Sequence, residues 1–560
     1  MPSPQASPRP LFAPLRDTPE RWLFTAFTAL LLAPMIAQGL QRPIALVLTG
    51  PIHSIPLTVS ALLVALAAWV PRAARPTPRP VLAWLPPALV AAALTATLHL
   101  GAAGLLSLLP AAAASGALSS WLPQRLPDAL DGLLARRRVL AALYVLLALI
   151  SVVQVARVSV FIADPTRTEA QIVPGIKFLE THSCLTAYVR ARDLAHDRVD
   201  NLYLAERWPV DLHVDPRPET PYSPFDLDEF FYPPPFLLIA EILAPLRGDF
   251  LAQRAAWFGL NGLFLAASFW LAARKLGGPH WHRPLLLAPL LLASLPVLSV
   301  LQIGNAQGLV VAIALLAMLA FDADRPALGG APLAIASLAK LSPGIFFVIL
   351  LVQKRWRAAA WTAGLSLGLL VLALVAYGTD PLVSWVTYAA PRLSSGLAFS
   401  PMLHHPESIA LNLSPAGAPF KLALLGVNIA DPWPIARRIN QLFTVLLVVV
   451  TVVLARRHPL RDAATRPARS LAWLALLFLA SLRSPFAPGY VTFAFVWLLT
   501  LLSTEVKTLR GGLALIGLFA LTTILPPLPT PQLALYTLFL PLLPMGVSLW
   551  LLLRRPPAAR

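Results

Sequence analysis

The apolar stretch at residues 139–162, VLAALYVLLALISVVQVARVSVFI, decides the fold class of this chain. It is long enough to cross the ~30 Å hydrocarbon core of a bilayer as a helix, which takes ~17–25 apolar residues. Similar stretches recur on both sides of it, and in the whole chain 57% of the residues are hydrophobic and 12% are charged. Soluble domains are roughly a quarter charged. Because a helix satisfies its own backbone hydrogen bonds in lipid, the sequence predicts an all-α polytopic membrane protein with roughly 16 crossings.

The net charge of +18 does not indicate nucleic-acid binding. The basic residues form short clusters between apolar stretches, as in cytoplasmic loops under the positive-inside rule. These clusters lie before residue 22 and at residues 72–79, 125–138, 354–357, 456–469, 507–510 and 554–555. Their alternation predicts a multi-pass protein of the inner (plasma) membrane with both termini in the cytoplasm. The single cysteine, Cys184, excludes an intrachain disulfide and argues against a cysteine-based metal site.

Two long polar segments, residues 163–231 and 377–437, fall outside the cytoplasm by the same alternation. Long loops of this kind often carry function. We therefore predict a transmembrane helix bundle with two long outer loops, in which residues 139–510 form the core. Residues 1–138 would be an N-terminal extension with four spans, and residues 511–560 would supply the last two. The short segment 235–246 is expected to be a half-membrane or horizontal helix.

Carboxylates at the outer face are candidates for a general base. Asp164 follows the span at 139–162 directly and precedes Pro165. It is suited to take a proton from an acceptor hydroxyl; the alternative is a solvated aspartate in an Asp-Pro turn. Asp226, Asp228 and Glu229 are the reserve candidates for the same role.

Two basic residues at membrane depth or at its edge are candidates for binding a phosphate. Lys340 lies where Ser342-Pro343 splits the apolar segment 326–353. An ionisable residue at this depth is a functional candidate by default, and the alternative is a lysine that snorkels to the interface. Arg483 ends another span and suits a phosphate oxygen or the membrane surface equally well.

The amides Gln302, Asn305 and Gln307 cluster in LQIGNAQG at residues 301–308. They suit the hydroxyls of a sugar, and they suit equally the role of tying two helices together. The sequence leaves both readings open. There is no Walker A, dinucleotide-binding or HExxH motif, which argues against an ATPase or a zinc protease.

Five patches, in order along residues 139–502, resemble motifs of the GT-C polyprenyl-phosphate-mannose-dependent α-mannosyltransferases. They are YVRARDLAHDRVDNLY (188–203), FYPPPFLL (231–238), GNAQG (304–308), ASLAKLSPG (336–344) with QKRWR (353–357), and SPFAPGY (484–490). The first two patches put Tyr188 and Tyr232 among the expected sugar or acceptor contacts.

The resemblance implies a GT-C fold with an extracytoplasmic active site. It implies transfer, with inversion, of mannose, or arabinose in related members, from a polyprenyl-phosphate donor to a lipid-linked or cell-envelope glycan acceptor. The expected partners are that donor, that acceptor and membrane lipids, with no nucleic acid, cofactor or obligatory metal. The chain departs from the family where an Asp usually precedes the position of Tyr188, because residues 182–187 are HSCLTA. It departs again at Gly489, where the family has a late His.

Two other classes of function remain as alternatives. A secondary transporter or lipid flippase would also use broken helices and a buried lysine, although the halves of this chain show no inverted repeat. A non-catalytic membrane scaffold is the third possibility, because the usual first-loop Asp is missing.

Overall fold

The computed structural model describes residues 19–70, 81–132, 138–208, 220–460, 466–526 and 528–553. All regular secondary structure in these ranges is helical, and none of it is strand. Seven of the described helices are long and apolar enough to cross a membrane, and the bent pair α12 and α13 would make an eighth. The predicted all-α polytopic membrane fold is confirmed.

The predicted number of crossings stays a prediction. Eight further helices in the described ranges are apolar but only 10–17 residues long. Breaks at proline-containing turns shorten several of them, as at Pro343. The basic residues expected to mark the cytoplasmic side before residue 19, at 72–79, at 136–137 and at 554–555 lie outside the described residues.

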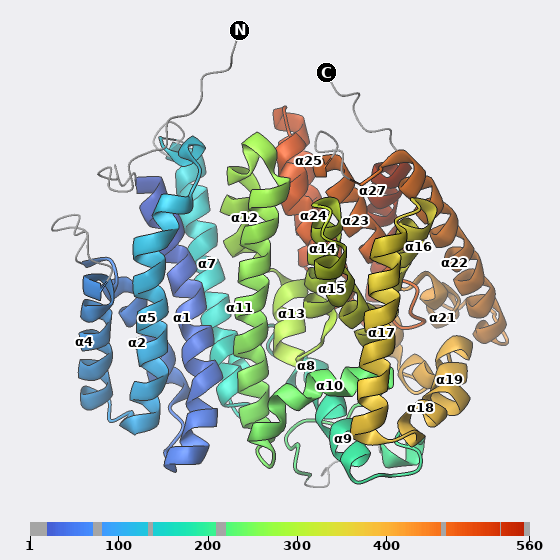
Figure 1. Cartoon of the computed structure of the whole chain (residues 1–560), viewed down its shortest axis with the longest axis horizontal. Coiled ribbons are helices and arrows are strands. Elements are labelled where there is room, and N and C mark those ends of the chain that lie inside the picture. Colours follow the sequence, from blue (N-terminus) through green and yellow to red (C-terminus); the bar gives the residue numbers. More distant parts are fainter. Residues whose placement is uncertain are drawn as a thin grey trace. The chain divides into compact units, whose positions relative to one another are not determined.

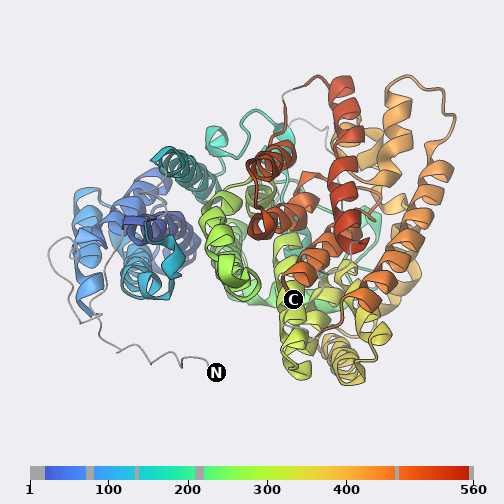
Figure 2. The same cartoon turned by 90° about the horizontal axis from the view of Figure 1, so that it is seen from above.

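The chain divides into two compact units, Met1–Ala170 and Gln171–Arg560. In the first unit α1 packs against α2, α5 and α7, and α5 also packs against α4. Figure 1 shows these blue and cyan helices side by side, and Figure 2 shows them nearly end-on. The helices of this unit are α1 (Pro19–Leu48), α2 (Ser54–Ala67), α4 (Val81–Thr97), α5 (Gly101–Arg125), η1 (Asp128–Leu130), α7 (Arg138–Ala163) and η2 (Thr168–Ala170). By its packing, α7, which we predicted to begin the core, belongs to the first unit.

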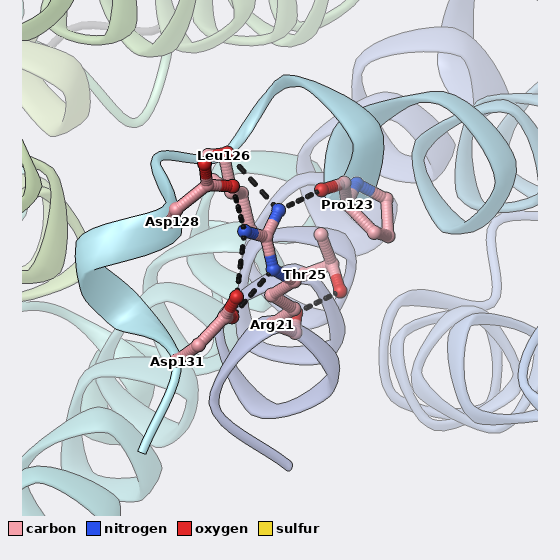
Figure 3. Close-up of polar contacts among 6 residues, drawn as sticks. All are labelled: Arg21, Thr25, Pro123, Leu126, Asp128 and Asp131. Atoms are coloured by element: carbon pink, nitrogen blue, oxygen red, sulfur yellow. Dashed lines mark hydrogen bonds and ion pairs between the residues drawn. The ribbon is translucent and has the colours of Figure 1, made fainter. Parts of the chain in front are cut away.

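A buried arginine fastens the start of α1 to the turn that follows α5 (Figure 3). Arg21 is 5% exposed. Its Nε donates to Oδ1 of Asp131 over 2.7 Å, and its Nη2 donates to Asp128 and Asp131 over 3.1 Å. Its Nη1 donates to the carbonyls of Pro123 (2.6 Å) and Leu126 (3.0 Å). The charge of Arg21 is thus neutralised by two carboxylates, and its donors are fully used.

The second unit begins with short helices and continues with long ones. In order they are α8 (Lys177–Thr181), α9 (Cys184–His196), η3 (Ala205–Arg207), η4 (Pro234–Phe236), α10 (Leu237–Ala240), η5 (Glu241–Leu246), α11 (Phe250–Leu276), η6 (Gly278–His280), α12 (His282–Leu292), α13 (Leu295–Ile303), α14 (Gln307–Asp322), α15 (Pro326–Ala339), η7 (Ser342–Gly344), α16 (Ile345–Val352) and α17 (Trp356–Tyr377). The break predicted at Ser342-Pro343 is present between α15 and α16. In Figure 1 the short α10, within the segment expected to be horizontal, lies across the direction of α11 and α17.

The remainder of this unit again begins with short helices and continues with longer ones. In order they are α18 (Asp380–Ser384), the π-helical turn η8 (Trp385–Ala389), α19 (Ala390–Ser395), η9 (Leu397–Phe399), η10 (Met402–His404), α20 (Pro406–Leu411), η11 (Pro415–Gly417), α21 (Ala418–Leu424), α22 (Pro432–Arg457), α23 (Arg466–Ser481), η12 (Gly489–Thr492), α24 (Phe493–Leu502), η13 (Ser503–Glu505), α25 (Leu509–Thr523), α26 (Thr530–Phe539) and α27 (Leu542–Leu553).

The two predicted outer segments meet at one end of the second unit. In Figure 1, α9 of the first segment and α18 and α19 of the second lie together at the lower end of this unit. Arg392 of α19 donates to Glu229, and the rings of Phe231 and Phe399 lie 5.4 Å apart. The polar segments are therefore folded structures that pack against each other.

Candidate functional site

A cavity of about 710 Å³ lies inside the second unit. Its polar lining comes from the start of α9, the loop before η4, the α13–α14 junction, the break after α15, the end of α23 with the segment that follows it, and Asn440 and Thr444 of α22. Part of the wall is apolar and is built by Ile345 and Val348 of α16 and by Leu447 and Val448 of α22. A cavity with convergent polar groups and apolar walls is the usual form of a small-molecule site.

The α13–α14 junction turns the chain sharply into the cavity. Gly304 ends α13 with a φ of +71°, a left-handed conformation that favours glycine. A Cβ atom there would also lie 3.2 Å from Cβ of Leu185 on α9. This turn brings Asn305 and Gln307, at the start of α14, to the cavity wall.

Lys340 reaches these two amides from the broken helix. Its backbone is extended, with φ −142° and ψ 132°, because α15 ends at Ala339. Its Nζ donates to Oδ1 of Asn305 and to Oε1 of Gln307, each over 3.0 Å. Among the described residues it makes no ion pair with a carboxylate. Two of its three N–H groups are used, and the positive charge is not neutralised.

Aromatic rings surround the ammonium group of Lys340. Its Nζ lies 5.8 Å from the ring centre of Tyr232 and 5.9 Å from that of Tyr490. The hydroxyls of Tyr232 and Tyr188 share a hydrogen bond of 2.9 Å, and the ring of Tyr232 stacks on Phe236 at 4.4 Å. A cation over ring faces is stabilised without being neutralised. The predicted residues Tyr188, Tyr232, Asn305, Gln307 and Lys340 thus line one cavity.

His182, just before α9, and Asp228, in the loop before η4, contact each other on the cavity wall. Nδ1 of His182 is 3.0 Å from Oδ1 of Asp228, and Nε2 of His182 is 3.4 Å from Sγ of Cys184. Nδ2 of Asn305 donates to the same sulfur over 3.1 Å. Burial lowers the pKa of His182, but the charge of Asp228, with a contribution from Cys184, outweighs it and raises that pKa well above its ordinary value.

His182, Cys184 and Asp228 also have the ligand types of a metal site, since one ligand atom of each lies within 4.8 Å of the others. However, the imidazole stands between the other two residues, with one ring nitrogen directed to each. A single ion cannot bind both nitrogens of one ring. The arrangement therefore fits a hydrogen-bonded chain of side chains better than it fits three ligands around one ion.

The other two reserve carboxylates are held differently. Glu229 lines the cavity but pairs with Arg392. Burial raises the pKa of Glu229, and the hydrogen bond and charge of Arg392 partly oppose this. Asp226 is not among the residues that line the cavity, and its backbone N–H and C=O are bonded to Thr181 and Thr186. Asp228 is thus the reserve carboxylate that lines the cavity without an arginine partner.

Two further predicted site residues, Asp164 and Gln302, are not among the residues that line this cavity, whereas Arg483 is. Asp164 belongs to the first unit, where it accepts from the hydroxyl of Thr166 (2.6 Å) and pairs with Arg167 (3.6 Å). Gln302 accepts from the backbone N–H of Ile172 (2.7 Å) and donates to the carbonyl of Leu179 (3.0 Å), so it ties the loop to α13. Arg483 lines the cavity at its edge and donates to Thr444 over 3.0 Å.

Sequence reasoning missed four residues of this site: His182, Cys184, Tyr490 and Arg392. A signal existed for the first two, because His182 and Cys184 stand in the stretch where the family resemblance leads one to expect an Asp. No local pattern marks Arg392, since its partner Glu229 lies in the other polar segment.

Together, the described helices and this cavity define an α-helical membrane protein with an internal polar site. The sequence profile of glycosyltransferase family 87 matches residues 230–485. This range contains Tyr232, Asn305, Gln307 and Lys340 but not the α9 residues. The similarity indicates a glycosyltransferase. A search of curated proteins and a search of solved structures each gave no match.

Proposed function

We propose that this protein transfers a sugar, most simply mannose, from a polyprenyl-phosphate donor to a lipid-linked or cell-envelope glycan acceptor. The reaction takes place on the extracytoplasmic face of the plasma membrane and inverts the anomeric centre. One observation carries the proposal: Lys340 is a partly buried cation without a carboxylate partner among the described residues, and it lines the same cavity as Asp228.

Lys340 is suited to hold the phosphate of the donor. A charge taken out of water is costly unless it is paired. The two amides and the aromatic rings around Lys340 orient it and leave its charge for an incoming anion. As the bond between the sugar and the phosphate breaks, negative charge grows on the leaving phosphate. A fixed cation at that point stabilises the transition state without reorganising.

Asp228 is suited to accept the proton. Its Oδ1 is bonded to His182, which leaves Oδ2 for a hydroxyl in the cavity. In the proposed step the acceptor oxygen attacks the anomeric carbon from the face opposite the phosphate. The new C–O bond forms, the hydroxyl proton passes to Asp228, and the phosphate leaves with the electron pair of the old bond. Asp164 remains the alternative base.

The test is sugar transfer in proteoliposomes from a radiolabelled polyprenyl-phosphate mannose to an extracted membrane-glycolipid acceptor, with polyprenyl-phosphate arabinose as a second donor. The wild-type protein should form labelled glycolipid, and Lys340→Met should lose most of this activity. Asp228→Asn and Asp164→Asn, run side by side, decide which carboxylate is the base. Absence of transfer from both donors, with lipid-linked sugar instead moving across the bilayer, would replace this proposal with a flippase.

A further inference from the structure

We propose that Cys184, His182 and Asp228 form one hydrogen-bonded relay, in which His182 is the positioning residue for the carboxylate that accepts the proton. The inference rests on the proposed function, which it deepens. It also assigns a purpose to the stretch HSCLTA at residues 182–187, where the family resemblance leads one to expect an aspartate.

The imidazole of His182 is held in a fixed orientation. Its ring stacks on Phe178 with the centres 4.3 Å apart and the planes 20° from parallel. One ring nitrogen is 3.0 Å from Asp228 and the other is 3.4 Å from Cys184. Because contacts on one face and at both nitrogens fix the ring, the hydrogen bond to Asp228 has a defined direction.

The backbone that carries Asp228 is fastened to the same helix start. The backbone N–H of Asp228 donates to Oγ1 of Thr186 over 3.0 Å. The hydroxyl of Thr186 lies within hydrogen-bonding distance of the carbonyls of Ser183 (2.8 Å) and Asp226 (3.1 Å). Thr186 therefore links the loop before η4 to the first turn of α9. Both ends of the His182–Asp228 pair are anchored, and the free carboxylate oxygen keeps its place in the cavity.

The charge of His182 suits this positioning role. Burial lowers the pKa of His182, but the charge of Asp228 outweighs it and raises that pKa well above its ordinary value, which favours an imidazolium with one N–H for Asp228 and another for Cys184. A hydrogen bond from a charged donor to a carboxylate is stronger than one from a neutral donor. His182 therefore holds Asp228 in position, although it does not touch the substrate itself.

Matched substitutions separate positioning from a merely structural role. In His182→Asn the side-chain amide can take the place of Nδ1, whereas in His182→Gln it takes the place of Nε2 and faces Cys184. We expect His182→Ala to lower kcat by ~100-fold with little change in KM, within the range known for acid–base groups. The fall in rate that deprotonation of His182 causes at alkaline pH should be absent from its pH–rate profile. His182→Asn should recover part of kcat while His182→Gln does not, and Lys421→Met, which lies outside the cavity lining, should keep the wild-type profile.

A second measurement needs no turnover. Cys184 is the chain's single cysteine, so alkylation by iodoacetamide, followed by intact mass, reports on it alone. The sulfur of Cys184 lies 3.4 Å from Nε2 of His182, so a substitution of His182 changes the immediate surroundings of the thiol. His182→Ala should therefore change the pH profile of alkylation relative to the wild type. Asp228→Asn should also change the profile, because it removes the charge that keeps His182 protonated, whereas Lys421→Met should not.

The outcomes of the two measurements are distinct. If the wild-type protein transfers no sugar, the proposed function fails, and the alkylation profiles still decide whether the relay exists. If transfer occurs but His182→Ala keeps the wild-type kcat and pH profile, His182 does not position the base. Alkylation profiles that are identical in the wild type, His182→Ala and Asp228→Asn would show that the three side chains are not coupled.

Discussion

Two cations, the buried Arg21 in the first unit and the partly buried Lys340 in the second, differ in what surrounds them. Arg21 in the first unit is bonded to two carboxylates and two carbonyls (Figure 3). Lys340 in the second unit is bonded to two amide oxygens and faces two aromatic rings. The first charge is neutralised and joins a helix to a turn. The second is oriented but not neutralised, which is the state expected of a group that waits for an anionic ligand.

A third cation, Lys421, shows that a second condition must be met before a cation is assigned to anion binding. Lys421 of α21 is also buried, and its Nζ donates to Oγ1 of Thr537 over 2.7 Å. It is not among the residues that line the large cavity. In the part of the chain that the structure describes, Lys421 also makes no ion pair with a carboxylate, so this lack is insufficient by itself, and access to the cavity is the second condition.

The substitution of Lys340 is expected to have the largest effect on sugar transfer. Lys340→Met keeps the length of the side chain and removes the charge, so transfer should fall by ~100- to 1,000-fold, as when one stabilising donor is removed from a transition state. The unfolding temperature in detergent should stay the same or rise, because a desolvated charge has been removed. Initial rates at saturating donor, beside the unfolding curve, test both parts. If Lys340→Met kept the wild-type rate of transfer, the unneutralised charge of Lys340 would have no role in the reaction, and the contrast with Arg21 would have no functional meaning.

Arg21→Met should lower the stability of the protein and leave the rate of transfer nearly unchanged, which is the reverse of the effect expected for Lys340→Met. It takes the arginine donor away from two buried carbonyls and removes the arginine from two exposed carboxylates, so we expect a loss of about 2–3 kcal/mol of stability. The rate of transfer per folded molecule should change little. Thermal unfolding followed by tryptophan fluorescence measures the first quantity, and activity normalised to folded protein measures the second. A selective loss of rate with normal stability would contradict the fastening role.

Lys421→Met should stabilise the protein by about 1–2 kcal/mol without lowering transfer. Burial lowers the pKa of Lys421 from 10.5 to about 7. Between these values the unfolded state binds more protons than the folded state, so wild-type stability rises with pH. The gain from Lys421→Met should therefore be full below pH 7 and shrink as the pH rises toward 10.5. Unfolding temperatures measured across this range test the sign, and a gain that grows with pH would refute it.

The smallest expected effect concerns the pair that joins the two polar segments. Arg392→Met leaves Glu229 buried without its cation, which should cost about 1 kcal/mol when the carboxyl is ionised. The raised pKa of Glu229 means that this cost falls away as the pH is lowered toward the ordinary value of 4.5. Unfolding temperatures of Arg392→Met and of the double variant with Glu229→Gln should converge at low pH. Equal differences at every pH would contradict the pairing.

The sequence was sufficient for the parts of the fold and site that depend on local chemistry. Apolar length predicted the helical membrane fold, and Ser342-Pro343 predicted the break that exposes Lys340. The sequence also singles out the amides at 302, 305 and 307, but only the structure shows which of them line the cavity. Gln302 has the same residue type and lies in the same stretch, yet its amide is used by the loop.

The acidic side of the site depends on contacts between distant parts of the chain. Asp228 and His182 are separated by the segment that contains α9, so no spacing rule connects them. Glu229 and Arg392 come from different polar segments. Asp164 was the first candidate because of its position at a helix end. Its role as a base stays a prediction, which Asp164→Asn tests against Asp228→Asn.

The apolar wall that α16 and α22 give to the cavity has a kinetic consequence. Only 33% of the most apolar window of α22 is buried inside the protein, so much of this helix faces outward. If the proposed prenyl-linked donor approaches along this wall, it diffuses in two dimensions, within one leaflet. Its effective concentration is then its mole fraction among the lipids rather than its amount per volume of buffer. Diluting the donor with inert phospholipid, at constant bulk concentration, would therefore lower the rate of sugar transfer.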